Sequence, residues 1–346
     1  MRPPFFVSAP LVVGGRLHQA AIRGACGACA GWGMTRAMPI FSESTPGGPS
    51  AAAVPAAAAG PAGANRAVPR ILIIAGSDSG GGAGIQADIK TVTMLGGHAM
   101  TAITAITAQN SLTVTGVLAV PAAMVIEQID AVAADLGIDA VKIGMIGSPE
   151  TAAAVAERLL SLGASPPRPG AADLPIVFDP VMVASSGSVL ADSATVAAFE
   201  RLMKAATLTT PNAPELAALT GLAVATVEQL ELAAVELARR TGCAVLAKGG
   251  HLAGDSLIDL LVDAAGEVTR FVGPRIASRH THGTGCTLAS GIACGLGRGL
   301  VLADAVRRGR DFTRAALAAA PGFGAGHGPM GHALGVVPFD SLSVRG

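Results

Sequence analysis

The chain is poor in the residues that contact nucleic acids and in the long apolar runs that span membranes. Of its 346 residues, 3% are aromatic and none is tyrosine, 14% are charged, and the formal net charge is zero. A nucleic-acid-binding protein needs a basic field, which this composition does not supply. No uninterrupted apolar run reaches the roughly 18 residues of a membrane-spanning helix. We therefore expect neither a nucleic-acid partner nor a membrane span.

Cysteines are few and irregularly spaced. The five are Cys26, Cys29, Cys243, Cys286 and Cys294. An odd number in a long chain argues against a disulfide framework and favours a reducing compartment, so we expect a cytoplasmic protein. Cys26 and Cys29 form a C-x-x-C pair, but no second ligand pair supports a zinc or redox site there.

The N-terminal part differs in composition from the rest. From Pro46 to Pro69 nearly every residue is alanine, glycine or proline, which leaves too little apolar surface to offset chain entropy. Residues 1–36 carry arginines and no acidic residue, as targeting segments do, but prolines and glycines interrupt their apolar run. We predict a disordered extension over 1–69, followed by one domain over 70–340.

From Arg70 onward, β-branched apolar runs alternate with helical patterns. The expected strands are 71–77, 100–107, 139–147, 175–183, 207–212 and 243–250, with an antiparallel addition at 256–263 and 267–276. The first expected helix follows the glycine-rich start of 80–97 and is closed by Gly96 and Gly97. The others are 121–137, 149–162, 192–205, 213–220 and 226–240, and two more begin near Thr284 and Leu302. Such runs without polar alternation are typical of strands that helices cover on both faces. The pattern predicts a single α/β domain with a mainly parallel sheet.

Ligands bind such sheets beyond the carboxyl ends of the strands. The first expected strand ends in "AGSDSGGGAGIQAD" (75–88), whose glycines let the backbone approach a ligand, with Asp88 one helical turn after Gly84. The spacing does not match the dinucleotide fingerprint, and Gln109 and Asn110 replace the acidic residue expected after the second strand. These departures disfavour a Rossmann oxidoreductase. The P-loop pattern is absent too, so a phosphate would have to be held by another part of the chain.

The segment "HTHGTGC" (280–286) lies where a loop meets an expected helix. Unpaired amides at a helix start point outward, and the helix dipole favours negative charge. Gly283 and Gly285 permit a tight turn around Thr284, so the segment predicts an anion hole for a transferring phosphoryl group. A plain glycine-bearing helix start, with Cys286 as a small buried residue, is the alternative interpretation.

Seven motifs together resemble those of bacterial hydroxymethylpyrimidine/phosphomethylpyrimidine kinases of thiamine biosynthesis: "AGSDSGGGAGIQADIKT", "ITAQNS", "VKIGMIGS", "VFDPVMVASSG", "TPNAPE", "KGGHL" and "THGTGCTLASGIA". They occur in the family's order over 70–335. The resemblance implies a ribokinase-like three-layer α/β/α fold with helices on both faces of the sheet. It also implies the use of ATP and Mg²⁺ to phosphorylate 4-amino-5-hydroxymethyl-2-methylpyrimidine to its monophosphate and then its diphosphate. A homodimer is compatible with it.

The resemblance further implies a site for the pyrimidine ring. The residues that match it are Gly76, Asp88, Gln109, Met145 and Val181. A carboxylate accepts from a ring amino group, a glutamine both donates and accepts, and methionine and valine supply apolar faces. Without the resemblance, Asp88 would be interpreted as a helix-surface acid, Gln109 as a strand-end amide, and the two apolar residues as core.

On the nucleotide side, the resemblance implies that Asn212 and Glu215 of "TPNAPE" form a magnesium-associated motif, assisted by Asp179. Lys248 would reach the phosphates as a mobile point charge, and Thr210 would line the same groove. On its own, Lys248 would be interpreted as an exposed lysine at a strand end.

Cys286 stands where many sugar kinases of the superfamily have an aspartate. We expect its place at a helix start to lower the pKa of the thiol, which could then accept the proton of the substrate hydroxymethyl group. The resemblance thus implies Cys286 as general base of the first phosphorylation, with Gly283, Thr284 and Gly285 holding the phosphoryl group. The acceptor of the second phosphorylation is already an anion and hardly needs a base.

Other functions stay open. Related kinases phosphorylate the similar ring alcohol of pyridoxine or pyridoxal, and a non-catalytic pyrimidine-binding relative would keep the same pocket. A hydrolase with Cys286 as nucleophile and His282 as its partner finds no acyl-enzyme site in the sequence. His280 and His282 are not assigned to catalysis, because lone histidines beside a phosphate loop are more often structural.

Overall fold

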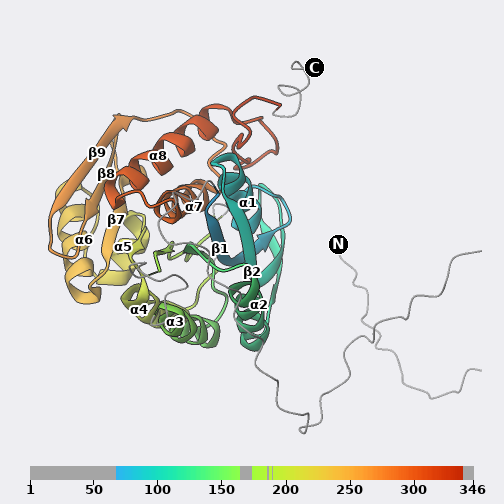
Figure 1. The fold of residues 1–346 in the computed structure, drawn as a ribbon. Coiled ribbons are helices and arrows are strands. Elements are labelled where there is room, and N and C mark those ends of the chain that lie inside the picture. The colour runs from blue at the N-terminus through green and yellow to red at the C-terminus, as the bar shows by residue number, and fades with distance from the viewer. Residues whose placement is uncertain (1–67, 164–173, 185–186, 189, 338–346) are drawn as a thin grey trace, which may run out of the picture. The chain divides into compact units, whose positions relative to one another are not determined.

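A computed structural model describes residues 68–163, 174–184, 187–188 and 190–337 (Figure 1). Nearly all of the extension expected over 1–69 lies outside these residues. Its last residue, Pro69, is buried, and its carbonyl oxygen accepts a hydrogen bond of 2.8 Å from the amide of His98. Pro69 therefore belongs to the folded unit and not to the extension. At the other end, 338–340 of the expected domain lie outside the described residues.

Nine strands of the described residues form one sheet, in the order β3-β2-β1-β4-β5-β6-β7-β8-β9. The strands are β1 (Arg70–Asp78), β2 (His98–Gln109), β3 (Val114–Ala119), β4 (Ala140–Ile143), β5 (Ile176–Phe178), β6 (Leu208–Thr209), β7 (Ala244–Lys248), β8 (Ser256–Val262) and β9 (Val268–Pro274). The six central strands pair in parallel, whereas the pairs β2–β3, β7–β8 and β8–β9 are antiparallel. The predicted mainly parallel sheet and its antiparallel addition are confirmed.

Three strands differ from the prediction. β5 and β6 are shorter than expected, because Pro180 and Pro211 lack the N–H that a central strand donates. β3 was not predicted: it is exposed along most of its length and carries Gly116 at its centre, so its sequence lacks a clear strand pattern. It pairs with β2 and brings Val114 opposite Gln109.

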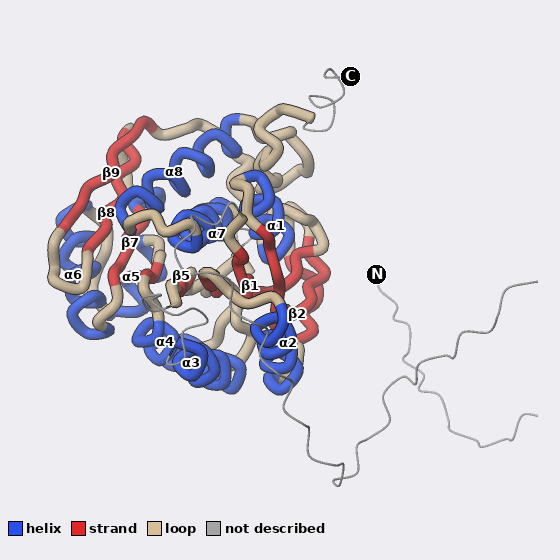
Figure 2. Tube along the Cα trace, viewed as in Figure 1, coloured by secondary structure: helices blue, strands red, loops and turns tan. Residues whose placement is uncertain are grey.

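The helices of the described residues all match predicted ones. They are α1 (Gly84–Met94), α2 (Ala122–Asp135), α3 (Pro149–Gly163), α4 (Ser193–Ala205), α5 (Ala213–Thr220), α6 (Val227–Thr241), α7 (Thr284–Gly297) and α8 (Leu302–Ala318), with a 3-10 turn at Gly249–His251. Helices α1, α7 and α8 cover one face of the sheet, and α2 to α6 cover the other (Figures 1 and 2). Among these helices, none is long and apolar enough to cross a membrane.

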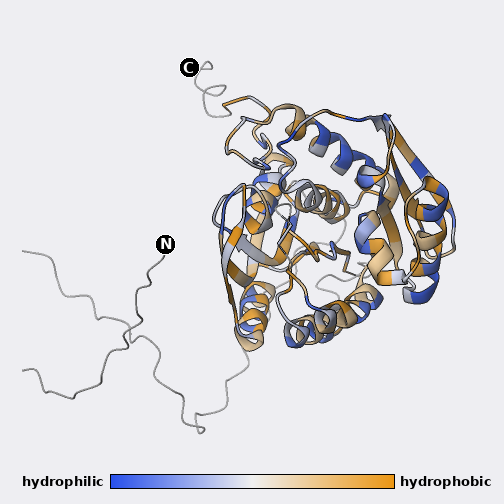
Figure 3. Ribbon diagram, turned by 180° about the vertical axis from the view of Figure 1, so that it is seen from behind, coloured by the Kyte–Doolittle hydropathy of each residue, from blue (hydrophilic) through white to orange (hydrophobic). Residues whose placement is uncertain are grey.

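Strand β1 shows why the apolar runs lack polar alternation. Its Ile71 and Ile73 pack with α1, α7 and α8, whereas Leu72 and Ile74 pack with the helices of the opposite face. Both faces of the strand are therefore buried, and hydrophobic residues follow the sheet in Figure 3. This arrangement confirms the predicted three-layer α/β/α architecture.

Candidate active site

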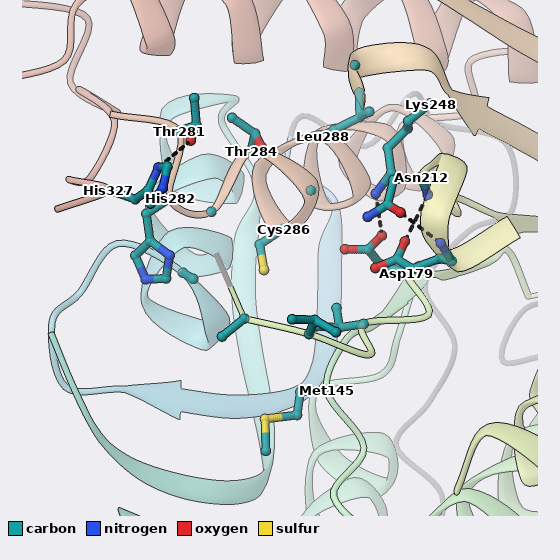
Figure 4. Close-up of a pocket in the computed structure, with 18 of the residues that line it drawn as sticks. Met145, Asp179, Asn212, Lys248, Thr281, His282, Thr284, Cys286, Leu288 and His327 are labelled. Carbon is teal, nitrogen blue, oxygen red and sulfur yellow. Dashed lines mark hydrogen bonds and ion pairs between the residues drawn. The ribbon is translucent and has the colours of Figure 1, made fainter. Parts of the chain in front are cut away.

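A cavity of about 850 Å³ lies beyond the carboxyl ends of the parallel strands. All of the site residues predicted from the sequence line it, except Asp88 and Thr210. In Figure 4 the sulfur of Cys286 points into the space between His282 on one side and Asp179 on the other, with Met145 on the facing wall. The sheet topology thus brings together residues that are far apart in the sequence, as expected for this class of fold.

The start of α7 forms one wall of the cavity. Its N-cap, Gly283, has a φ of 87°, in the left-handed region that favours glycine, and a side chain there would overlap the carbonyl oxygen of Gly82. No side chain caps the first turn, and Thr284, Gly285 and Cys286 line the cavity. The helix start therefore turns its first amides and its positive dipole end toward the space where an anion could bind.

Lys248 and Asp179 form an ion pair beside this helix start. The Nζ of Lys248 lies 2.9 Å from Asp179 Oδ1, which also accepts a hydrogen bond of 2.8 Å from the Thr210 hydroxyl. Burial lowers the pKa of Lys248, but the carboxylates of Asp179 and Glu215 outweigh burial and raise it, so the ammonium stays charged. Thr210 does not line the cavity as expected. It is fully buried and orients Asp179.

Asn212 and Glu215 form a capping box at the start of α5. The Asn212 side chain accepts from the Glu215 amide at 2.9 Å, and Glu215 Oε2 accepts from the Asn212 amide at 2.8 Å. Burial raises the pKa of Glu215 to about 7. No group of three metal-binding side chains occurs in the described residues. Two carboxylates, Asp179 and Glu215, suit a magnesium ion that keeps most of its water and phosphate ligands.

The residues expected around the pyrimidine ring lie together, apart from Asp88. A side chain on Gly76 would come within 3.2 Å of the Met145 sulfur, and Val181 and Gln109 line the same cavity. This part of the cavity combines an amide with apolar surface, which is the composition of a small-ring site.

Asp88 is turned away from the cavity. Its completely buried carboxylate accepts from Lys142 Nζ and from the Ser290 hydroxyl, both at 2.7 Å. Burial lowers the pKa of Lys142, but the Asp88 carboxylate outweighs burial and raises it, so Lys142 is positively charged. Neither interpretation from the sequence, a substrate ligand or a surface acid, describes this counter-ion. Lys142, which the sequence analysis overlooked, lines the cavity itself.

The thiol of Cys286 does not have the lowered pKa expected from its place at a helix start. Burial raises the pKa to about 11; Lys142 opposes this shift, and the carboxylates of Asp88 and Asp179 add to it. The expected lowering is therefore wrong, because lost hydration and two nearby carboxylates outweigh the favourable charges. Without ligands, the thiol is neutral at physiological pH.

One further residue at the cavity, Asp78, was missed by the sequence analysis. Asp78 ends β1, and its carboxylate accepts hydrogen bonds from the amides of Gly80, Gly82 and Ala83 at 2.8, 3.0 and 2.8 Å. It also lies 2.9 Å from the ring of His282. An acidic residue directly before a glycine-rich loop is the signal that could have found Asp78, because such loops need an acceptor for their amides.

Residues 78–331 match the family model for phosphomethylpyrimidine kinase. The chain belongs to this family. It is 45% identical over 265 residues to the hydroxymethylpyrimidine/phosphomethylpyrimidine kinase of Streptomyces coelicolor, covering 76% of this chain and 94% of that protein. It is 47% identical over 266 residues to the thiamine biosynthesis bifunctional protein ThiED of Geobacter sulfurreducens, covering 76% of this chain. The match covers about half (52%) of the length of that relative.

Solved structures agree with the assignment. A phosphomethylpyrimidine kinase from Clostridium difficile has a TM-score of 0.61 at 34% identity, over 71% of this chain and 98% of that one. The pyridoxal kinase from Staphylococcus aureus, in complex with AMP-PCP and pyridoxal, has a TM-score of 0.68 at 30% identity, over 77% and 94%. The predicted family, its ribokinase-like fold and the assignment as a kinase are confirmed, and the non-catalytic alternative is not supported.

Proposed function

We propose that this kinase transfers the γ-phosphoryl group of ATP to 4-amino-5-hydroxymethyl-2-methylpyrimidine, and then a second phosphoryl group to the monophosphate. One observation carries the proposal: a single cavity holds the uncapped start of α7, the cation of Lys248, and a small-ring site at Gln109 and Met145. A phosphate site and a ring site thus lie in one cavity, which Cys286 also lines. Relatives that carry this activity in their names support the choice of substrate.

The phosphate groups of ATP would lie between the first amides of α7 and the ammonium of Lys248. When bound, Mg²⁺ would neutralise charge on the phosphate oxygens, and Asp179 and Glu215 would hold its water ligands. The amides and the ammonium are fixed before the reaction, so they stabilise the charge of the transferring group without reorganising.

Cys286 is the proposed proton acceptor for the substrate hydroxyl. Because burial raises the pKa of its thiol to about 11, the thiol must lose its proton before it can act as a base. The first phosphorylation should therefore accelerate with pH over the range in which the enzyme is folded. The monophosphate already bears the nucleophilic oxygen as an anion, and its transfer depends on positioning and electrostatics.

Pyridoxal phosphorylation is a second candidate, because the TM-score to a pyridoxal kinase (0.68) is higher than that to a phosphomethylpyrimidine kinase (0.61). The test is to incubate the full chain with magnesium-ATP and either the pyrimidine alcohol or pyridoxal, and to identify products by mass. We expect the pyrimidine mono- and diphosphates. Pyridoxal phosphate without any pyrimidine phosphate would reject the proposal in favour of the second candidate. The homodimer and the cytoplasmic location stay predictions.

A further inference from the structure

One ring nitrogen of His282 contacts two side chains of opposite hydrogen-bonding chemistry. Its Nε2 lies 2.9 Å from Asp78 Oδ2 and 3.3 Å from the amide nitrogen of Gln109. His282 is 6% exposed and Asp78 4%, so water hardly competes for these atoms. A ring nitrogen carries either a proton or a free lone pair. It cannot both donate to a carboxylate and accept from an NH₂ group.

The ionisation state of Asp78 determines whether Nε2 of His282 carries a proton or a free lone pair. Burial raises the pKa of this carboxyl, but the hydrogen bonds from His282 and from the backbone amides of Ala83 and Gly80 outweigh burial and lower it. Asp78 is therefore an ionised carboxylate, which can only accept. The Nε2 of His282 must therefore carry a proton and donate a hydrogen bond to Asp78, so it has no lone pair for the Gln109 amide.

Thr107 places a second constraint on the same amide. The hydroxyl of Thr107 donates its only proton to the carbonyl oxygen of Ser77 at 2.9 Å. Its other neighbour, the Gln109 amide oxygen at 3.3 Å, is also an acceptor. Both conflicts disappear when the amide turns by half a revolution about its last torsion. The amide oxygen then faces the N–H of His282, and the amide nitrogen donates to Thr107.

We propose that Asp78 and His282 are positioning residues that act through Gln109, by holding the amide oxygen on the His282 side and the amide nitrogen on the Thr107 side. In this orientation one N–H and one lone pair of Gln109 remain for a ligand. Such an amide pairs with an edge on which an amino group stands beside a ring-nitrogen acceptor, as glutamine pairs with adenine. The 4-aminopyrimidine ring has that edge, so the pair selects aminopyrimidines; this step rests on the proposed function.

The tautomer of His282 can be measured without any substrate. The chain has seven histidines, so long-range ¹H–¹⁵N spectra of the ¹⁵N-histidine-labelled full chain are simple to assign, with the His282 signal identified by its loss in His282→Gln. We expect a proton on Nε2 at pH 8. A proton on Nδ1 alone would overturn the proposal whatever the enzyme phosphorylates.

Two substitutions of His282 separate positioning from simple packing. A glutamine places a donor close to the position of Nε2, whereas an asparagine places it close to Nδ1. We expect His282→Asn to raise the KM for the pyrimidine alcohol about tenfold, as for one lost hydrogen bond between uncharged groups, with kcat changed less than about threefold. His282→Gln should recover most of this loss.

A double-mutant cycle tests whether His282 acts through Gln109. In a Gln109→Ala background, His282→Asn should raise the KM no further, because the amide that it orients is gone. Equal KM values for His282→Asn and His282→Gln, or a loss that persists in Gln109→Ala, would overturn the proposal. If the wild-type chain does not phosphorylate the pyrimidine at all, the proposed function fails instead, and the tautomer measurement still decides the positioning pair.

Discussion

Lys142 and Asp88 form an ion pair from which solvent is excluded: their charged atoms are 2.7 Å apart, and both side chains are completely buried. The pair connects β4 to α1, and the hydroxyl of Ser290 extends the connection to α7. Because Lys142 also lines the cavity, this buried pair joins the core to the candidate active site.

Removing either partner of this pair alone should destabilise the fold strongly, and removing both should cost less than the sum of the two single losses. Lys142→Met leaves an uncompensated carboxylate and Asp88→Asn an uncompensated ammonium, so each should lower the free energy of unfolding by about 3–5 kcal/mol. The double variant should lose clearly less than the sum of the two, as measured by urea denaturation at pH 7.

The matched control is the exposed pair of Lys204 and Glu200, whose charged atoms lie 2.8 Å apart on one helix. Lys204→Met should change the free energy of unfolding by no more than about 0.5 kcal/mol. Additive losses at Lys142 and Asp88, or losses as small as that of the control, would show that the buried charges do not depend on each other.

The same pair marks the limit of what the sequence predicts. The fold could be predicted from the sequence, because strands buried on both faces must be apolar throughout, and their carboxyl ends share one edge of the sheet. The role of Asp88 could not be predicted, because an acid within a helical pattern is usually exposed, and its partner Lys142 stands 54 residues away. Asp78 and His282 are 204 residues apart. A motif gives the residue types at a site, but only the packed chain shows which charges neutralise one another.

The environment of Cys286 illustrates the same limit. A helix start predicts a lowered thiol pKa, and the helix start is present. The carboxylates of Asp88 and Asp179 and the loss of hydration come from other elements, and they reverse the direction. The sequence around Cys286 therefore predicts only the effect of its own helix on the thiol pKa.

Substitution of Cys286 by alanine should affect the two phosphorylations unequally. Loss of a general base typically slows a reaction by about 10²–10⁴-fold, and we expect a loss of this size with the pyrimidine alcohol. With the monophosphate the loss should be much smaller, because its oxygen is already ionised. Each substrate is assayed separately under saturating magnesium-ATP. Equal losses in both reactions would contradict the assignment of Cys286 as base.

The reactivity of the Cys286 thiol provides an independent measurement. With a pKa of about 11, roughly one thiol in a thousand is ionised at pH 8, so alkylation by iodoacetamide should be slow and should accelerate about tenfold per pH unit. Mass spectrometry of the peptide that contains Cys286 gives the rate, and Cys286→Ala is the blank. A rate that reaches a plateau below pH 9 would refute the raised pKa.

A methyl group at Gly285 should disturb the phosphate site specifically. It would lie 2.9 Å from Asp179 Oδ2 and 3.2 Å from Lys248 Nζ, closer than side-chain carbons normally approach. Gly285→Ala should therefore displace the ion pair and lower kcat/KM for ATP by about tenfold to a hundredfold. Gly163→Ala is the matched control, because no atom lies within 4 Å of its added methyl group at the end of α3. Comparable kinetics of the two variants would exclude close packing at Gly285 as a requirement.

His332 should make the stability of the fold depend on pH. It is 4% exposed, and its Nε2 lies 2.9 Å from the Thr287 hydroxyl. Burial, assisted by the charge of Lys90, lowers the pKa of this imidazole to about 4, against about 6.5 in an unfolded chain. Between these values the unfolded chain binds a proton that the folded chain does not. The contribution of His332 is therefore complete above pH 6.5 and is lost as the pH falls toward 4.

His332→Gln removes the titration and keeps a polar group near Thr287. Between pH 7 and pH 4, the free energy of unfolding of the wild-type chain should fall by about 3 kcal/mol more than that of His332→Gln, as measured by urea denaturation. His98→Gln, at an exposed histidine, controls for the substitution itself. The two curves of unfolding free energy against pH separate only if the folded chain disfavours a charged imidazole. Parallel curves for the wild type and His332→Gln would therefore contradict the lowered pKa, because they would mean that the protonated imidazole is hydrated or paired in the folded chain.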